Sequence, residues 1–165
     1  MKEYLIVCVD DEREVLDSVL QDLSDFEEHF IIEGAESVSE AKEIIDEQRN
    51  EQVPLALILC DHIMPGETGV SFLIELSQDK PTRNSRKILL TGQAGHEDTI
   101  EAVNHSCLDF FISKPWRGDE LREVIKQQLT TYMIENEPEL APWARILDTE
   151  RIFNALSDNR LSYGD

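Results

Sequence analysis

Five polar side chains stand at the ends of short apolar runs, where they could bind a cation or take part in group transfer: Asp10, Asp11, Asp61, Thr91 and Lys114. Three carboxylates in a single crevice repel one another unless a cation lies among them. Oxygen ligands with few protein donors suit Mg²⁺, which keeps several of its waters. Together with a lysine and a hydroxyl, such a site contains the parts needed for phosphoryl transfer, with one carboxylate as the nucleophile.

Asp61 has the most informative surroundings of the five. It ends the apolar run Leu55–Cys60, and the turn residues Pro65, Gly66 and Gly69 follow it. A continuous apolar run bounded by turn residues indicates a strand that is buried on both faces of a parallel sheet. A carboxylate at the carboxyl end of such a strand lies in the crevice where open α/β sheets bind ligands. The alternative is that Asp61 merely caps the helix that follows, and the other strand ends decide between the two interpretations.

Apolar runs and helical periodicities alternate along the chain. Strands are expected at residues 4–9, 29–35, 55–60, 87–90 and 108–114. Apolar residues at helical spacing follow each strand, in the segments 15–23, 41–45, 70–76, 97–104 and 119–129. Five such repeats specify a parallel sheet with helices on both faces. The carboxyl ends of its strands share one edge, so the five polar residues are expected to converge there.

Composition narrows the classes of partner. The 165 residues include 35 acidic and 15 basic ones, for a net charge of -20, which repels nucleic acid and anionic membranes and favours a cation or a basic partner surface. No apolar run approaches the roughly 20 residues that span a bilayer. The N-terminal residues lack a signal-peptide pattern, so we expect a cytoplasmic location without membrane insertion. Cys8, Cys60 and Cys107 lack paired metal-ligand spacing and are expected to be reduced, the first two as core residues.

Four motifs occur in order at the expected strand ends: the acidic pair Asp10-Asp11, the loop from Asp61 through Met64-Pro65-Gly66 to Gly69, the pair Thr91-Gly92, and Phe111 followed by Lys114-Pro115. This set resembles the receiver domain of two-component response regulators over residues 1–130. The resemblance implies a flavodoxin-like, doubly wound fold of five parallel strands in the order 2-1-3-4-5. The capping interpretation of Asp61 is then the weaker one, because the other strand ends supply what a nucleophile needs.

The resemblance also implies a role for each motif residue. Asp61 accepts a phosphoryl group from a phosphohistidine on a sensor histidine kinase or a histidine phosphotransfer protein. Mg²⁺ is bound directly by Asp11 and Asp61, with Asp10 acting partly through water and the main-chain carbonyl of Ile63 as a further ligand. Lys114 pairs with a phosphoryl oxygen, Thr91 turns its hydroxyl toward the phosphate, and Phe111 is the switch aromatic that turns inward as Thr91 moves. The Lys114–Pro115 peptide bond is cis in this family.

The same resemblance implies a signalling role and no enzyme activity beyond slow self-dephosphorylation at most. The moving face comprises the fourth helix, fifth strand and fifth helix, here residues 97–129, and its expected target is a downstream protein or a second copy of the chain. Phe110 and Trp116 lie on this face beside the switch. Both are candidate contacts, but buried packing is the expected role of Phe110 because of its composition.

Three other classes of protein could place an aspartate at such a position. An aspartyl-nucleophile phosphatase needs a second Asp two residues after the nucleophile, where this chain has Ile63. A flavodoxin needs a Ser/Thr-rich phosphate loop after the first strand, and the acidic residues 10–12 would repel a flavin phosphate. A receiver-like binding module without chemistry is not excluded by the fold, although it would not need the complete set of polar residues.

Residues 131–165 form an acidic, amphipathic extension that is expected to be helical, with a break near Asp148. Direct DNA binding is not expected, because seven acidic residues face only three arginines in this segment. The extension can fold back on its own domain, dock on another subunit or begin a larger output domain. Trp143 and Phe153 are the candidate anchors of such contacts, with core packing as the competing interpretation.

Overall fold

The computed structural model describes residues 1–92, 104 and 107–162, without the side chains of residues 91 and 160–162. Its strands are β1 (Leu5–Val9), β2 (Ile31–Ala35), β3 (Leu55–Cys60), β4 (Arg86–Thr91) and β5 (Phe110–Ser113). Its α-helices are α1 (Arg13–Asp22), α2 (Val38–Asn50), α3 (Gly69–Gln78), α5 (Gly118–Asn136) and α6 (Thr149–Ser162), and short 3-10 turns lie at Ser24–Phe26, Lys80–Thr82 and Ala141–Arg145. The helix expected at residues 97–104 falls almost wholly outside the described residues.

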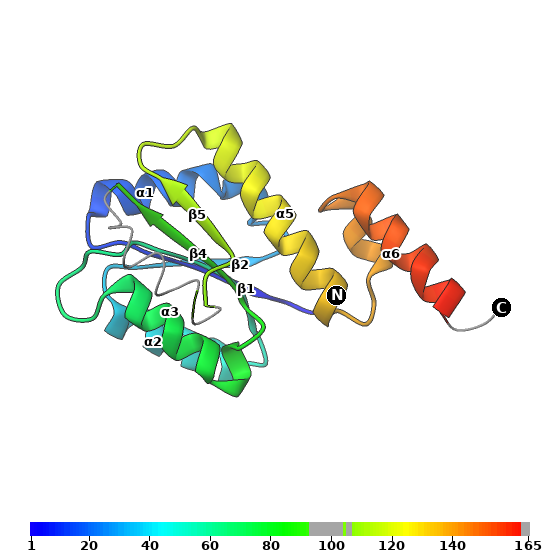
Figure 1. Ribbon diagram of the computed structural model, residues 1–165, viewed down its shortest axis with the longest axis horizontal. Helices are drawn as coiled ribbons and strands as arrows, with labels where there is room; N and C mark the ends of the chain where they lie inside the picture. The colour runs from blue at the N-terminus through cyan, green and yellow to red at the C-terminus, as the bar shows by residue number, and fades with distance from the viewer. Residues whose placement is uncertain (93–103, 105–106, 163–165) are drawn as a thin grey trace.

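The five strands form one parallel sheet in the order β2-β1-β3-β4-β5, as predicted (Figure 1). Helices α1 and α5 cover one face, and α2 and α3 cover the other. The strand side chains alternate between these faces: Ile6 and Cys8 of β1 join the core under α1 and α5, whereas Leu5 and Val7 join the core under α2 and α3. Strands β1 and β3 are therefore apolar at every position, as the sequence pattern indicated.

The turn after β3 brings backbone atoms very close together. The N–H of Gly69 donates to the carbonyl of His62 at 2.9 Å. A Cβ atom at position 69 would lie 2.0 Å from the carbonyl oxygen of Asp61, so only glycine fits. Thr68 then caps α3 by accepting a hydrogen bond from the N–H of Ser71 at 3.2 Å. The turn thus fixes the backbone that carries Asp61.

Helix α5 is longer than expected, since it passes residue 130 without interruption and ends at Asn136. The apolar helical spacing ends at Leu129, and the polar break at residues 135–142 suggested a domain end near residue 130. In the structure the hydroxyls of Thr130 and Thr131 donate to carbonyls one turn back in the helix, and Thr130 also accepts from the N–H of Asp148 at 3.1 Å. Tyr132 and Met133 in the last turns are buried. The additional residues of α5 form a surface on which the C-terminal extension packs.

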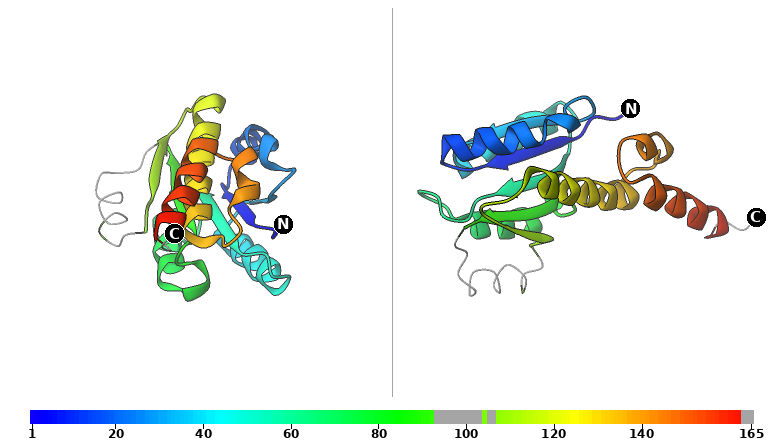
Figure 2. Two further views of the ribbon diagram at one scale, coloured as in Figure 1. Left: turned by 90° about the vertical axis from the view of Figure 1, so that its right-hand side faces the viewer. Right: turned by 90° about the horizontal axis from the view of Figure 1, so that it is seen from above.

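The C-terminal extension folds back on its own domain, at the amino ends of the strands (Figures 1 and 2). Trp143 is 1% exposed, and its ring centroid lies 5.2 Å from that of Phe30 and 5.8 Å from that of Tyr4. The Tyr4 hydroxyl donates to the carboxylate of Glu137. Asp148 marks the expected break and caps α6 by accepting from the N–H of Arg151 at 3.0 Å. Of the two candidate anchors, Trp143 is a core residue, whereas Phe153 is 55% exposed.

Two further features of the fold concern the cysteines and the membrane. Cys8 and Cys60 are buried with free thiols, and burial raises the pKa of Cys8 to about 12. Both are core residues, as predicted.

Within the described ranges, no helix combines the length and hydropathy needed to cross a bilayer.

The packing of the extension predicts that Trp143→Ala lowers the free energy of unfolding by about 3–5 kcal/mol, because it removes a large side chain from a filled core. Phe153→Ala, in the same extension but exposed, should change it by about 0.5 kcal/mol or less. Urea unfolding followed by circular dichroism measures both. Equal stability of the two variants would show that the extension does not share the core of the domain.

The turn after β3 predicts that Gly69→Ala destabilises the fold by about 3 kcal/mol, because the added methyl group overlaps the Asp61 carbonyl and forces the backbone apart. Gly66→Ala is the matched control, since nothing lies within 4 Å of its Cβ position and only its φ of +89° opposes a side chain. Its cost should be about 1 kcal/mol. Thermal unfolding of the two variants would contradict the prediction if Gly66→Ala were the less stable one.

Candidate functional site

Three carboxylates meet at the carboxyl edge of the sheet. Asp10 follows β1, and its N–H donates to the carbonyl of Ala35 at 3.0 Å, while the N–H of Asp61 donates to the carbonyl of Val9 at 2.9 Å. The ladder hydrogen bonds therefore continue past the strand ends and hold both residues side by side. Carboxylate oxygens of Asp10, Asp11 and Asp61 all lie within 4.8 Å of one another. The convergence expected from the strand-end pattern is present for these three residues.

Lys114 reaches the same point from the end of β5. Its Nζ donates to Oδ2 of Asp10 at 2.9 Å and to Oδ1 of Asp61 at 3.3 Å. The Lys114–Pro115 peptide bond is cis, as the resemblance implied. The other oxygen of Asp10 accepts from the N–H of Glu12 at 2.9 Å, so both of its oxygens are engaged. The ammonium group thus bridges two carboxylates from neighbouring strands.

Burial and mutual repulsion shape the ionisation of the cluster. Asp10 and Asp61 are 2% and 5% exposed. Burial, and next the negative charge of Asp10, raise the pKa of Asp61, and Lys114 only partly offsets them. Burial alone would lower the pKa of Lys114, but its hydrogen bond to Asp10 and the two carboxylate charges outweigh that effect and raise it. A lysine with a raised pKa is a permanent positive charge at neutral pH.

The donor set fits a hard divalent cation. Three carboxylates supply oxygen atoms close enough to bind one ion, and Asp11 is exposed, which leaves room for the water ligands that Mg²⁺ keeps. The single lysine cannot balance three carboxylates, so the cluster retains net negative charge. Among the described residues, this is the one group of three or more potential ligands with such geometry.

The three other predicted site residues are Thr91, Phe111 and Ile63, and the structure gives fewer contacts for them. Thr91 ends β4 directly beside Ser113 of β5, which puts its backbone at the site edge; its side chain lies outside the described part of the chain. Phe111 pairs with Leu89 in the sheet and is 36% exposed. Ile63 lies in the loop after Asp61 with a 62% exposed side chain, and the role of its carbonyl stays a prediction.

One expectation about the β5 face was wrong. Phe110 is 42% exposed, whereas we expected it to be buried. Its aromatic character suggested a core residue, but β5 is an edge strand of the sheet, and all four of its residues are at least partly exposed. Phe110, Phe111 and Trp116 line one shallow hollow together with residues of α5. The face beside the switch position is therefore more apolar than sequence reasoning indicated.

Sequence reasoning also missed the role of His62. It is 6% exposed, and its Nδ1 accepts from the N–H of Val70 at 3.4 Å, while its carbonyl accepts from Gly69. The residue thus ties the loop after Asp61 to the start of α3 through both side chain and backbone. No spacing pattern signals such a role, because the contact depends on how the turn closes.

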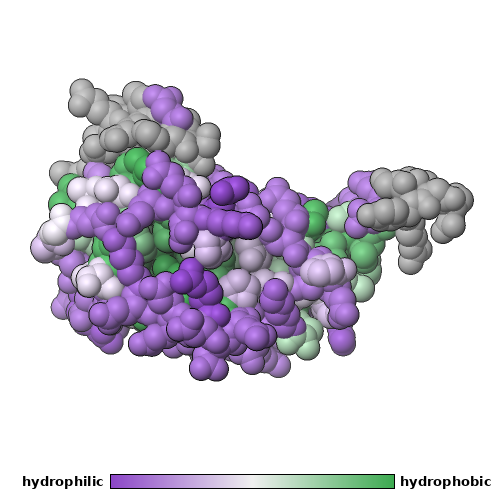
Figure 3. Space-filling model, turned by 90° about the horizontal axis from the view of Figure 1, so that it is seen from below, coloured by the Kyte–Doolittle hydropathy of each residue, from purple (hydrophilic) through white to green (hydrophobic). Residues whose placement is uncertain are grey.

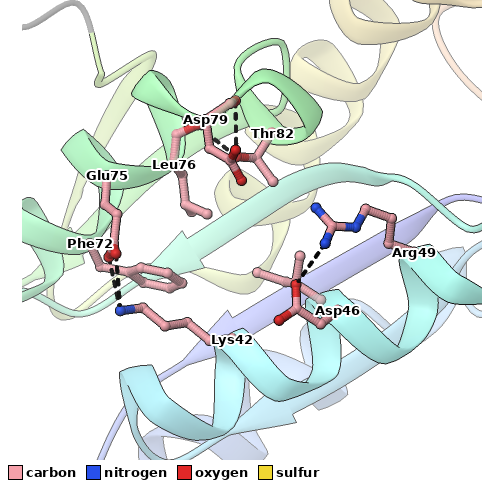
Figure 4. A pocket seen from close by; sticks show the side chains of 9 residues that line it. Lys42, Asp46, Arg49, Phe72, Glu75, Leu76, Asp79 and Thr82 are labelled. Carbon is pink, nitrogen blue, oxygen red and sulfur yellow. Dashed lines mark hydrogen bonds and ion pairs between the residues drawn. The ribbon is translucent and has the colours of Figure 1, made fainter.

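A second hollow, between α2 and α3, does not share these features (Figure 4). Four of its charged side chains are paired with one another: Lys42 lies 2.9 Å from a carboxylate oxygen of Glu75, and Arg49 lies 3.4 Å from one of Asp46. Figure 3 shows this face of the molecule as largely hydrophilic, with apolar side chains visible in its hollows and on the extension. Among the described residues, the groove holds no group of three carboxylates like Asp10, Asp11 and Asp61.

Comparisons with known proteins point to one family. The chain is 31% identical to the hydrogenase transcriptional regulatory protein HoxA of Cupriavidus necator over 136 residues, which is 82% of this chain and 26% of that protein. It is 30% identical to the response regulator Rre1 of Synechocystis over 127 residues, 75% of this chain and 51% of that protein. The chain therefore spans about a quarter to a half of the length of these relatives.

A solved structure of similar fold comes from the same family. A CheY-like response regulator receiver domain protein from Methanospirillum hungatei superposes with a TM-score of 0.69 at 29% identity, over 82% of this chain and 100% of that one. Residues 6–126 match the family model described as the response regulator receiver domain. With the flavodoxin-like sheet order and the acidic cluster already on the same edge, the chain belongs to the receiver domains of two-component response regulators.

Proposed function

We propose that this receiver domain accepts a phosphoryl group on Asp61 in a Mg²⁺-dependent reaction. The observation that carries the proposal is the placement of Asp61: a buried carboxylate at the carboxyl edge of the central strand β3, next to two further carboxylates and within 3.3 Å of a lysine ammonium group. A purely structural carboxylate would not need two like charges beside it. The arrangement instead suits a nucleophile whose product carries additional negative charge.

In this proposal, Asp61 is the nucleophile, and the residues around it stabilise the charge of the transferred group. A carboxylate oxygen of Asp61 attacks the phosphorus of a phosphohistidine; a P–O bond forms, the P–N bond breaks, and the imidazole leaves. Lys114, already held between Asp10 and Asp61, pairs with a phosphoryl oxygen. Asp10, Asp11, Asp61 and the carbonyl of Ile63 hold Mg²⁺, which when bound neutralises charge on the transferred group. Thr91 donates its hydroxyl to the new phosphoryl group.

The phosphoryl donor in this proposal is a sensor histidine kinase or a histidine phosphotransfer protein in the cytoplasm, and the phosphorylated domain loses the group only slowly by itself. The output is a change of the face expected over residues 97–129. Thr91 of β4 and Phe111 of β5 stand on adjacent strands beside it. Phe110 and Phe111 give this face exposed apolar side chains, and the half-buried Trp116 lines the same hollow, which suits a protein partner or a second copy. The chain does not contact DNA itself in this proposal, because its net charge of -20 repels the phosphate backbone.

Labelling with acetyl phosphate tests the phosphoacceptor assignment. The protein should gain the mass of one phosphoryl group in the presence of Mg²⁺ and none when divalent cations are chelated. Asp61→Asn should take no label, because an amide is not a nucleophile, and Lys114→Gln should slow labelling by roughly tenfold or more, since one positive charge beside the phosphoryl group is lost.

Asp46→Asn serves as the matched control, because it removes an exposed carboxylate that pairs only with Arg49 and should label like the wild type. Hydroxylamine, which cleaves acyl phosphates, should remove the label. A label that survives hydroxylamine, or that persists in Asp61→Asn, would contradict the proposal.

A second measurement addresses the output. Beryllofluoride with Mg²⁺ mimics the aspartyl phosphate, and it should change the mass measured by light scattering or the binding of a partner. Phe110→Ser, which removes an exposed apolar contact on the responding face, should weaken that change and leave acetyl phosphate labelling intact. The proposed output face is wrong if mass and partner binding stay the same with and without beryllofluoride.

A further inference from the structure

The short loop between β5 and α5 is fastened at two points to the same β1–α1 unit. Lys114 donates to Asp10, which follows β1, at 2.9 Å. Two residues later, Nε1 of Trp116 donates to Oδ2 of Asp22, the last residue of α1, at 2.8 Å. Between these contacts lies the cis bond to Pro115. One charge-assisted hydrogen bond on each side of the proline thus holds the loop, the first to the residue after β1 and the second to the end of α1.

The Asp22 end of this connection is closely fitted. A Cβ atom at Gly118 would lie 2.8 Å from Oδ1 of Asp22, so the start of α5 approaches that carboxylate closely. Nη1 of Arg122, one turn further along α5, lies 3.9 Å from the same oxygen. The Trp116 ring is partly buried and packs against the core that α1 and α5 share. The indole N–H therefore meets a carboxylate whose position both helices restrict.

We propose that the hydrogen bond between Trp116 and Asp22 positions Lys114 at the phosphoacceptor site. Lys114 alone has a long, flexible side chain, whose placement depends on the backbone that carries it. Fixing residue 116 on α1 limits the paths that the backbone of residues 114–115 can take. Neither Trp116 nor Asp22 belongs to the carboxylate cluster, and their hydrogen bond is made to each other. They are positioning residues, and their effect rests on the proposed phosphoryl transfer to Asp61.

The test measures the rate of acetyl phosphate labelling at saturating Mg²⁺, because this small donor needs no docking surface on the protein. Trp116→Phe keeps most of the packing and removes the N–H, and Asp22→Ala removes the acceptor. Each should lower the labelling rate constant of folded protein by roughly tenfold, since misplacing a charged group by a fraction of an ångström weakens transition-state stabilisation. The double variant should be no slower than either single one, because all three lack the same bond.

Two controls separate positioning from general damage. Asp22→Asn retains an oxygen that accepts from the indole N–H and should label at close to the wild-type rate, although the charge facing Arg122 is lost. Arg117→Ala alters an exposed residue of the same loop, whose ion pairs are with Asp119 and Glu120, and should leave the rate unchanged. Urea unfolding of every variant gives the folded fraction by which each rate is corrected.

The outcomes distinguish this inference from the proposed function. A wild-type protein that takes no label removes the phosphoacceptor assignment itself. A labelled wild type together with unchanged rates in Trp116→Phe and Asp22→Ala would overturn the positioning role alone. Rates that fall only in proportion to the unfolded fraction, or additive losses in the double variant, would also overturn it, since both results mean that the residues act separately or only through stability.

Discussion

The site depends on one ammonium group that stands between two buried carboxylates. Asp10 and Asp61 belong to neighbouring strands, and their charges in a crevice of low polarity oppose the close approach that the sheet imposes on them. Lys114 offsets part of this repulsion through contacts of 2.9 and 3.3 Å, and it follows β5, an outer strand of the sheet. The three strand ends are therefore coupled by charge as well as by the sheet, and the residual negative charge leaves the cluster receptive to a cation.

The sheet makes this coupling possible because β1 and β3 are apolar on both faces. Side chains alternate between the two cores along β1 and along β3 from Leu57 to Cys60, so neither strand can slip by one residue without exchanging these contacts. Register is thereby fixed, and with it the height at which Asp10 and Asp61 leave the sheet. Gly69 adds a local constraint, because its missing side chain lets the return of the chain pass against the Asp61 carbonyl.

The features that followed from the sequence were those with a local signature. The apolar run Leu55–Cys60 and the polar residues at strand ends identified the sheet, its order through the family resemblance, and the acidic cluster with Lys114. Features that depend on distant partners did not follow. The exposure of Phe110 results from the place of β5 at the sheet edge. The sequence does not decide whether Trp143 is a core residue or an interface anchor, because its neighbours Tyr4 and Phe30 lie more than a hundred residues earlier in the chain.

Helix α5 connects the two ends of the domain. Its first residue, Gly118, lies against Asp22 beside the loop that carries Lys114, and its last turns include Tyr132 and Met133 in the core that buries Trp143. An uninterrupted helix of 19 residues moves as a stiff body over short distances, because its hydrogen bonds resist local bending. The C-terminal extension is bonded to α5 through Arg151 and Asp148. One continuous helix thus joins the loop that carries Lys114 to the extension.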